Sequence, residues 1–324
     1  MKIENGALRT GKIIRYSLVV LLAILVGVLT IGSFTMLDMA LKPTYGKGRD
    51  LEGSLARIRK DYPLTISWID SLQTHEALKD TFITTNDGRR LHAFYVRAPK
   101  STAKTALLLH GYTDRAIRML PIGYIYHHLM GYNLLLPDIQ AHGESDGEVI
   151  QMGWKDCIDI KRWSQLADVI FGSKTRQVIH GISMGGFMTM VLAGEDMPQM
   201  EAFVDDCGYT SVWDEFANEL KASFGLSEFP LMYTTSLLCK IRYGWSFGEA
   251  DAVKKVRNSE KPVFFIHGDK DRYVPTHMVH TLYDAKPQPK ELWLTPGVEH
   301  AMSFYTYPEE YATRVVNFCQ KYLH

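Results

Sequence analysis

Short apolar runs alternate with amphipathic stretches along most of the chain. Strands are expected at residues 106–110, 133–136, 177–180, 202–205, 262–268 and 291–294, and helices at 156–170, 186–193 and 309–322. Residues 80–85 and 91–96 predict a β-hairpin, because the Asn-Asp-Gly turn at 86–88 supplies a positive φ. This alternation is typical of an α/β fold with a mostly parallel sheet and helices on both faces.

A long apolar stretch near the N-terminus differs from these short runs. No residue from 16 to 37 is charged, and residues 18–29 are almost wholly aliphatic. A helix of this length crosses roughly 30 Å of hydrocarbon at about 1.5 Å per residue. A cleaved signal peptide has a similar charged start and apolar run, but here the run is long and no clear small-x-small cleavage site follows. We therefore expect an uncleaved, single-pass membrane helix that contacts the lipid bilayer through residues 16–37.

Basic residues lie on both sides of this stretch. They are Lys2, Arg9, Lys12 and Arg15 before it and Lys42, Lys47 and Arg49 after it. Because basic flanks favour the cytoplasmic side, the small excess before the stretch predicts a cytoplasmic N-terminus. The remainder of the chain is then expected on the non-cytoplasmic side.

The pattern divides the chain into three parts. We expect a tail and anchor at residues 1–41, a helical connector at 42–79 and the main domain at 80–324. Within the connector, residues 51–59 and 66–72 have apolar positions at helical spacing. Their Leu, Ile and Trp side chains favour packing on the main domain over a free stalk.

Composition narrows the function classes. The 36 Lys and Arg residues balance 36 Asp and Glu residues, and no long basic stretch is present, which argues against a nucleic-acid partner. The four cysteines are widely spaced and form no metal-type pair, so we expect small buried apolar residues instead of ligands. They are Cys157, Cys207, Cys239 and Cys319. No metal and no organic cofactor are expected.

The sequence Gly181-Ile182-Ser183-Met184-Gly185 lies between a predicted strand and a predicted helix. A serine between two glycines on such a turn is typical of a nucleophile elbow, because a tight turn excludes bulky Cβ atoms at its flanks. The helix that follows directs its free N–H groups toward an anion formed at the serine. Ser183 is therefore the candidate nucleophile, with Gly181 and Gly185 as the elbow glycines.

An acid and a histidine follow the serine in the order that such an elbow predicts. Asp271 lies in the loop after the strand at 262–268, and we prefer it to Asp269 because it is farther from the strand end. Asp206, at the end of an earlier strand, is the alternative acid. His300 follows the last predicted strand. A serine hydroxyl needs a base to take its proton, and a carboxylate fixes the tautomer of that imidazole.

Two backbone N–H groups are expected to form an oxyanion hole. One belongs to Met184, directly after the nucleophile, and the other to Tyr112, after the apolar strand that ends in His110-Gly111. A negative oxygen on a tetrahedral intermediate needs two such preorganised donors. Asp138 and His142, with Asp114 across from them, lie on neighbouring loops, where a loop-stabilising role is the usual one.

These motifs together resemble the α/β-hydrolase superfamily from about residue 80 to the C-terminus. Residues 138–147 are similar to its Asp-x-x-x-His-Gly-x-Ser-x-Gly segment, and His110-Gly111 resembles its oxyanion-loop signature. Residues 153–159 resemble the next stretch of bacterial serine aminopeptidase-like or acyl-esterase-like hydrolases. Gln140 and Asp156 depart from those relatives, which often carry arginine and glutamate there. The departures leave the triad intact but argue against borrowing a substrate specificity.

The resemblance implies a role for each candidate residue. Ser183 is the expected nucleophile, Asp271 the acid, His300 the base, and Tyr112 and Met184 the oxyanion donors. Between about residues 207 and 260 the strand–helix alternation stops and aromatic residues are frequent. In this superfamily such an insertion commonly forms a cap over the nucleophile, so we expect a small helical cap here.

We expect a membrane-anchored serine hydrolase that cleaves a small-molecule or lipid-like carboxylic ester or thioester through an acyl-enzyme. The alternative is peptide hydrolysis from an N-terminus, with a short peptide as substrate. That reaction needs acidic groups that hold the ammonium of the substrate. The candidates in the cap are Glu215, Glu219, Glu228 and Glu249. A ligand-binding scaffold without turnover is the third possibility.

Overall fold

A single mostly parallel sheet forms the centre of the protein. The structure, a computed structural model, describes residues 2–43, 50–172 and 174–323. Among the basic residues on the two sides of the apolar stretch, Lys47 and Arg49 lie outside the described residues. The side chains of Lys2, Arg9 and Lys12 are not described either. Eight strands of the described residues pair in the order β1-β2-β4-β3-β5-β6-β7-β8. They are β1 (Lys79–Thr84), β2 (Arg90–Val96), β3 (Lys104–Leu109), β4 (Asn133–Pro137), β5 (Arg176–Ile182), β6 (Met200–Asp206), β7 (Val263–Gly268) and β8 (Lys290–Thr295). Strand β2 runs opposite to the other seven strands of this sheet, which are parallel to one another, and this confirms the predicted fold class.

The strands are apolar on both faces because helices cover both. In β3, Leu107 and Leu109 belong to one hydrophobic cluster, whereas Ala106 and Leu108 belong to the other. Successive side chains of a strand point to opposite faces, so a continuous apolar run serves two cores. This explains why the run before Gly111 lacks polar alternation.

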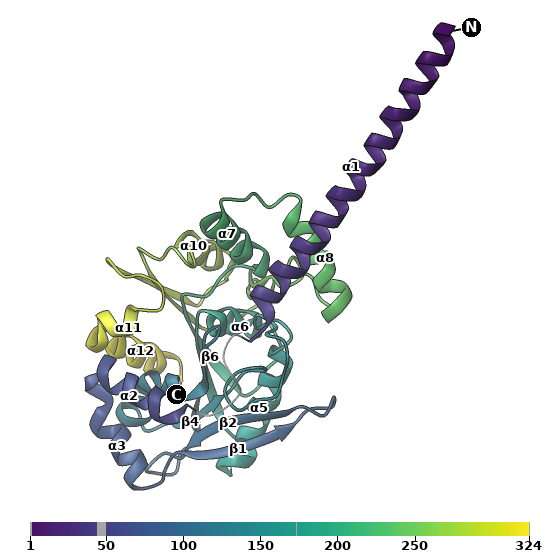
Figure 1. Cartoon of the computed structure of the whole chain (residues 1–324). Helices are drawn as coiled ribbons and strands as arrows, with labels where there is room; N and C mark the ends of the chain where they lie inside the picture. Colours follow the sequence, from purple (N-terminus) through teal and green to yellow (C-terminus); the bar gives the residue numbers. More distant parts are fainter. Residues whose placement is uncertain (1, 44–49, 173, 324) are drawn as a thin grey trace.

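Two groups of helices supply the rest of these cores (Figure 1). On one side lie α5 (Cys157–Phe171), α6 (Met184–Ala193) and α10 (His277–Ala285). On the other side lie α2 (Leu51–Asp61), η1 (Pro63–Thr65), α3 (Ile66–Thr74), η2 (Ala116–Met119), α4 (Leu120–Tyr124), η3 (Ile125–Leu129), α11 (Ser303–Thr306) and α12 (Pro308–Tyr322). Helices α2 and α3 bury Leu55, Ile58 and Trp68 in the second core, so this segment packs on the body.

Three helices lie between β6 and β7, of which the first two form the cap and the third packs on α6. They are α7 (Val212–Phe224), α8 (Leu231–Tyr243) and α9 (Ala252–Val256). Ser211 caps α7 by accepting from the N–H of Asp214 at 3.0 Å, and Gly225 ends it in a left-handed conformation. The predicted helical cap is therefore present.

The first helix, α1 (Lys2–Leu41), extends far from the body and contains one candidate membrane span at Ile13–Leu41 (Figure 1). Its C-terminal turns lie against α8, where Ser33 Oγ donates to Thr234 Oγ1 at 2.7 Å. Leu37 and Leu41 are fully buried there. The apolar helix is thus exposed over most of its length and joined to the cap at its end.

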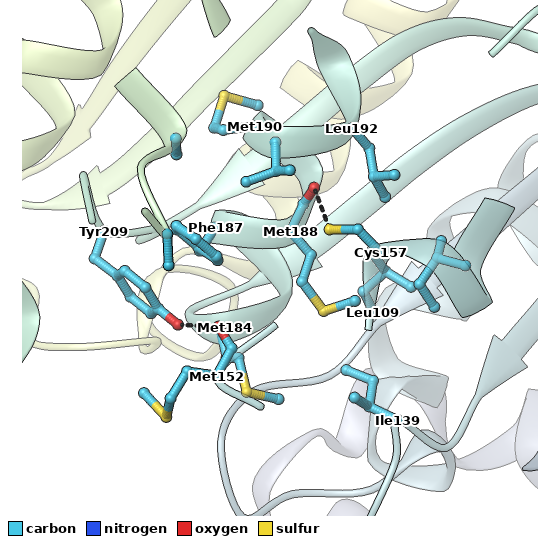
Figure 2. Close-up of a cluster of buried hydrophobic side chains, with 14 of the residues drawn as sticks. Leu109, Ile139, Met152, Cys157, Met184, Phe187, Met188, Met190, Leu192 and Tyr209 are labelled. Atoms are coloured by element: carbon cyan, nitrogen blue, oxygen red, sulfur yellow. Dashed lines mark hydrogen bonds between the residues drawn. The ribbon is translucent and has the colours of Figure 1, made fainter. Parts of the chain in front are cut away.

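Helix α6 is embedded in the first core (Figure 2). Phe187 stacks on Tyr209 with ring centroids 4.5 Å apart, and the Tyr209 hydroxyl donates to the carbonyl of Met152 at 2.9 Å. Cys157 contacts the backbone of the same helix through the carbonyl of Met188. Packing on all sides fixes the position of the helix that begins directly after Ser183.

Candidate active site

Ser183 lies on a sharp turn between β5 and α6. Its backbone has φ 57° and ψ −114°, a region that residues with a Cβ rarely adopt. A Cβ on Gly181 would collide with the carbonyl of Gly185, and one on Gly185 would collide with the carbonyl of Leu109. The two glycines therefore permit the close approach of β3, β5 and α6 that this turn requires.

The structure brings Ser183, His300 and Asp271 together. His300 Nε2 lies 2.9 Å from Ser183 Oγ, and His300 Nδ1 lies 2.7 Å from Asp271 Oδ2. Because an ionised carboxylate only accepts hydrogen bonds, Nδ1 carries the proton and Nε2 is free to accept from the serine hydroxyl. The three side chains come from the loops after β5, β7 and β8 at one edge of the sheet.

The carboxylate of Asp271 is held in place on all sides. Its Oδ1 accepts from the backbone N–H groups of Tyr273 at 3.0 Å and Val274 at 2.9 Å. Burial opposes ionisation of this carboxyl, but hydrogen bonds from His267 and His300 outweigh burial and lower its pKa. Asp271 is therefore a carboxylate at neutral pH.

His267 was not singled out from the sequence. Its Nε2 donates to the carbonyl of Val274 at 2.9 Å and lies 3.3 Å from Asp271 Oδ2, so this carboxylate lies between two imidazoles. Burial lowers the pKa of His267, whereas the contact with Asp271 raises it, and the net direction is upward. The sequence feature that could have indicated His267 is its position at the end of β7, four residues before Asp271.

The two other candidate acids have different partners. Asp269 accepts from the N–H of Gly297 at 2.7 Å, and Asp206 Oδ2 accepts from the Tyr311 hydroxyl at 2.8 Å. Burial raises the pKa of Asp206 to about 6 despite the bond from Tyr311. Of the three acids, Asp271 is the one that hydrogen-bonds to His300.

The loop after β3, which is expected to supply an oxyanion donor and is called the oxyanion loop below, faces the serine. Tyr112 lines a cavity of about 760 Å³ together with Ser183 and His300. Met184 is the first residue of α6, so its N–H has no acceptor in a preceding helical turn. The Tyr112 hydroxyl donates to the carbonyl of Ala40 at 2.8 Å, which joins the oxyanion loop to the end of α1.

The polar residues on the neighbouring loops hold those loops together. Asp138 is buried and accepts from the backbone N–H groups of Ala116 at 2.7 Å and Glu144 at 3.1 Å. His142 Nε2 accepts from the N–H of Thr113, next to Tyr112, at 3.1 Å. Burial lowers the pKa of His142 to about 4, so the ring is a neutral acceptor. Asp138 and His142 thus have the loop-stabilising contacts expected for this segment.

Asp114 and Gln140, also noted in the sequence, have ordinary surface partners. Asp114 lines the cavity and forms an ion pair with Arg118 at 3.1 Å, and Gln140 Oε1 accepts from Arg89.

One group of side chains in the described part of the chain has metal-type geometry. Ligand atoms of Cys207, Asp271 and His300 lie within 4.8 Å of one another. Two of these residues already bond to each other beside Ser183, and burial raises the pKa of the Cys207 thiol well above its usual range. An ion there would occupy the imidazole that contacts the serine. All four cysteines are buried and free.

A second, smaller cavity of about 270 Å³ adjoins the first. Tyr112 and Tyr273 line both cavities, and the ring of Tyr273 lies 5.0 Å from the ring of His300. The remaining walls of the smaller cavity come mainly from the end of α1 and from the cap helices α7 and α8.

The sequence is similar to those of a known family and of several known proteins. The sequence profile of the prolyl oligopeptidase family matches residues 146–324, more than half of the chain. The uncharacterized protein YqkD of Bacillus subtilis is 28% identical over 77% of this chain and 82% of its own length. The α/β hydrolase domain-containing protein WAV2 of Arabidopsis thaliana is 23% identical over 83% of this chain and 85% of its own.

Solved structures of other proteins are similar to this structure. The Pyrococcus furiosus esterase Pf2001 superimposes with a TM-score of 0.62 and 25% identity, over 76% of this chain and 93% of the esterase. The family match and the esterase fold support hydrolase activity. The chain therefore belongs to the prolyl oligopeptidase family, within the α/β-hydrolase superfamily.

Proposed function

We propose that this chain is a membrane-anchored serine hydrolase that cleaves carboxylic esters or thioesters. The observation that carries the proposal is the continuous line of hydrogen bonds from Ser183 Oγ through the His300 ring to Asp271. A base within bonding reach of a hydroxyl, oriented by a carboxylate, is the arrangement that activates a serine nucleophile. The lowered pKa of Asp271 supports its role as the fixed negative charge behind the base.

The reaction follows from these contacts. Ser183 Oγ attacks the substrate carbonyl while His300 Nε2 takes the hydroxyl proton. The backbone N–H groups of Tyr112 and Met184 stabilise the oxygen anion of the tetrahedral intermediate. His300 then gives its proton to the leaving oxygen or sulfur as the bond to the carbonyl carbon breaks. Water, deprotonated by His300, attacks the acyl-enzyme in the same way and releases the acid and free Ser183.

The membrane location rests on α1. Its apolar span is mostly exposed to the surroundings, as a helix in lipid is, and a curated relative from Saccharomyces cerevisiae is described as a membrane protein. That relative is 24% identical over 68% of this chain and 75% of its own length. Burial of Leu37 and Leu41 in the body argues against a cleavage that would remove these residues. We propose an anchor at 1–41, a connector at 42–79 and a hydrolase domain at 80–324 on the non-cytoplasmic side, with its cap at about 207–260.

Aminopeptidase-like hydrolysis is the second candidate. Of the four cap glutamates, Glu215 and Glu219 line the smaller cavity beside the serine, where carboxylates would hold a substrate ammonium. Glu228 instead accepts from Trp213, and Glu249 forms an ion pair with Lys240 at 2.6 Å. The predominantly apolar walls of that cavity favour the ester.

A panel of p-nitrophenyl esters, assayed beside aminoacyl p-nitroanilides, tests the proposal. We expect ester hydrolysis to dominate and to fall to background in Ser183→Ala. Dominant anilide hydrolysis that also depends on Ser183 would favour the peptidase. No hydrolysis of either class above the Ser183→Ala background would favour a binding scaffold.

A further inference from the structure

The cavity beneath the cap is lined by the membrane helix itself. Met36, Met39 and Ala40 of α1 form one wall, α7 forms a second and α8 a third. The walls from α7 and α8 include Glu215, Phe216, Glu219, Leu220, Leu231 and Met232. Methionine side chains are flexible and adapt to irregular apolar ligands. The anchor is therefore part of a binding cavity and does more than tether the domain.

This cavity adjoins the nucleophile. Tyr112 and Tyr273 separate it from the space around Ser183 and line both spaces. Tyr112 is fixed by its bond to Ala40, and the Tyr273 ring packs on His300. A substrate with its carbonyl carbon at Ser183 Oγ has an apolar cavity of about 270 Å³ directly beside it.

The one fully buried acid in these walls does not make the cavity a charged site. Glu215 is 2% exposed, and its Oε2 has no hydrogen-bond partner among the described residues. Burial raises the pKa of Glu215 well above its usual range, and the nearby Glu219 raises it further. Without a cation beside it, Glu215 is a neutral carboxylic acid, which is compatible with an alkyl chain in the cavity.

The outer face of the cap is apolar where it meets the anchor. Tyr233, Leu237 and Ile241 of α8 are four residues apart and are 55%, 61% and 73% exposed. Phe229, one step before them, is 74% exposed. Helix α8 lies alongside α1 (Figure 1), so this stripe continues the apolar surface of the candidate membrane span. Exposed apolar side chains in a row do not stabilise a helix in water, whereas a helix at a membrane interface buries such side chains in lipid.

We propose that the cavity between α1, α7 and α8 binds the acyl chain of a lipid ester that enters from the bilayer, beside the α8 stripe. The proposal rests on the serine hydrolase function proposed above and names its substrate class. It assigns two roles that neither the fold nor the triad requires. Helix α1 is a wall of the acyl site, and α8 is the part of the cap that contacts the membrane.

The acyl site is tested with the full chain in lipid nanodiscs and two soluble esters, p-nitrophenyl acetate and octanoate. Each methylene buried in an apolar pocket is worth about fourfold, so we expect kcat/KM to be at least tenfold higher for octanoate. Met36→Trp and Met232→Trp fill the cavity from two different walls. Each is expected to lower the octanoate-to-acetate ratio at least tenfold. Ile31→Trp, on an exposed position of the same helix, is the matched control and should leave the ratio unchanged.

The source of the chain is tested with a diacylglycerol placed in the nanodisc. Leu237→Glu combined with Ile241→Glu puts charge on the stripe but not in the cavity. We expect hydrolysis of the diacylglycerol to fall at least tenfold while the octanoate-to-acetate ratio stays as in the wild type. Equal diacylglycerol hydrolysis in the two proteins would contradict entry beside α8.

The outcomes separate this inference from the proposed function. Ester hydrolysis that depends on Ser183, but with the same octanoate-to-acetate ratio in wild type and both filling variants, would overturn the acyl site and leave the serine hydrolase intact. Filling variants that impair only aminoacyl anilides would identify an ammonium site and overturn the acyl site. No Ser183-dependent hydrolysis of any substrate would overturn both. Thermal melting of each variant shows that it is folded, and one folded filling variant suffices.

Discussion

The candidate site depends on how Asp271 is held. Two backbone N–H groups fix one carboxylate oxygen, and His300 and His267 contact the other. This arrangement leaves the carboxylate one orientation, and the carboxylate in turn leaves His300 one tautomer. In the proposed mechanism the reactivity of Ser183 therefore depends on Asp271, which reaches the serine hydroxyl through His300.

Asp271→Asn tests this dependence. The amide keeps the shape of the side chain but lets the imidazole take the wrong tautomer, so we expect kcat for ester hydrolysis to fall about 10⁴-fold. Steady-state kinetics at neutral pH measure it. Asp269→Asn is the matched control, because its side-chain oxygen still accepts from Gly297 and does not contact His300. An Asp271→Asn variant within tenfold of the wild type would mean that another residue orients the base.

Asp205, beneath the elbow, predicts a pH dependence of stability. Burial raises its pKa to about 7 despite the nearby positive charge of His267, whereas an unfolded aspartate titrates near 4. Between these values the folded state holds a proton that the unfolded state lacks. Stability therefore falls as pH rises, by about 1 kcal/mol per pH unit.

Asp205→Asn removes this ionisation and keeps an acceptor for the N–H of Gly208. We expect the melting temperature of Asp205→Asn, relative to that of the wild type, to rise as pH increases from about 4 to about 7. Scanning calorimetry at several pH values in that range measures the difference. A constant difference between the two proteins would show that Asp205 is ionised throughout.

At the scale of elements, the elbow is a junction of three segments packed at backbone distance. Helix α6 can start beside β3 and β5 only because Gly181 and Gly185 lack side chains. The strain at Ser183 is sustained by the core around α6 (Figure 2).

Gly185→Ala tests this junction. Its Cβ would meet the Leu109 carbonyl, so β3 and α6 must move apart, and Leu109 leads into the oxyanion loop. We expect a loss of about 1–3 kcal/mol in stability and a larger proportional loss of activity. Gly248→Ala is the control, because nothing lies within 4 Å of the position of its Cβ. Equal effects of the two substitutions on melting temperature and activity would contradict the role given to the elbow.

Sequence patterns predicted the strands and several helices, but not α4, α10 or the contacts between distant segments. Apolar runs predicted the strands because parallel strands are buried on both faces, and the Ser, Asp and His order predicted which loops carry the site. The contact between His267 and Asp271 depends on the turn after β7, which apolar spacing does not specify. The bond from Tyr112 to Ala40 joins segments 72 residues apart, and no local pattern predicts it.

On the scale of the whole molecule, α1 and the edge of the sheet that carries the candidate site form one structure. The last turns of α1 pack against the cap and accept a hydrogen bond from the oxyanion loop. The proposed membrane attachment and the candidate active site are therefore mechanically connected, as they would not be through a flexible linker.

Two truncations separate attachment from support of the site. Removal of residues 1–31 takes away most of the apolar span but leaves the buried Leu37 and Leu41. We expect this chain to become extractable from membranes with alkaline carbonate and to keep a melting temperature close to that of the full chain. Removal of residues 1–43 exposes the cavity and breaks the bond to Tyr112, so melting temperature and kcat should both fall. Equal melting temperatures and kcat values for the two truncated chains would contradict a structural role for the end of α1.

The most direct test of the central claim is mass spectrometry of the full chain after reaction with a fluorophosphonate. We predict a single covalent adduct on Ser183 that forms quickly in the wild type, at least a hundredfold more slowly in His300→Ala, and not at all in Ser183→Ala. An unlabelled Ser183, or one labelled at the same rate without His300, would contradict a serine activated by that imidazole.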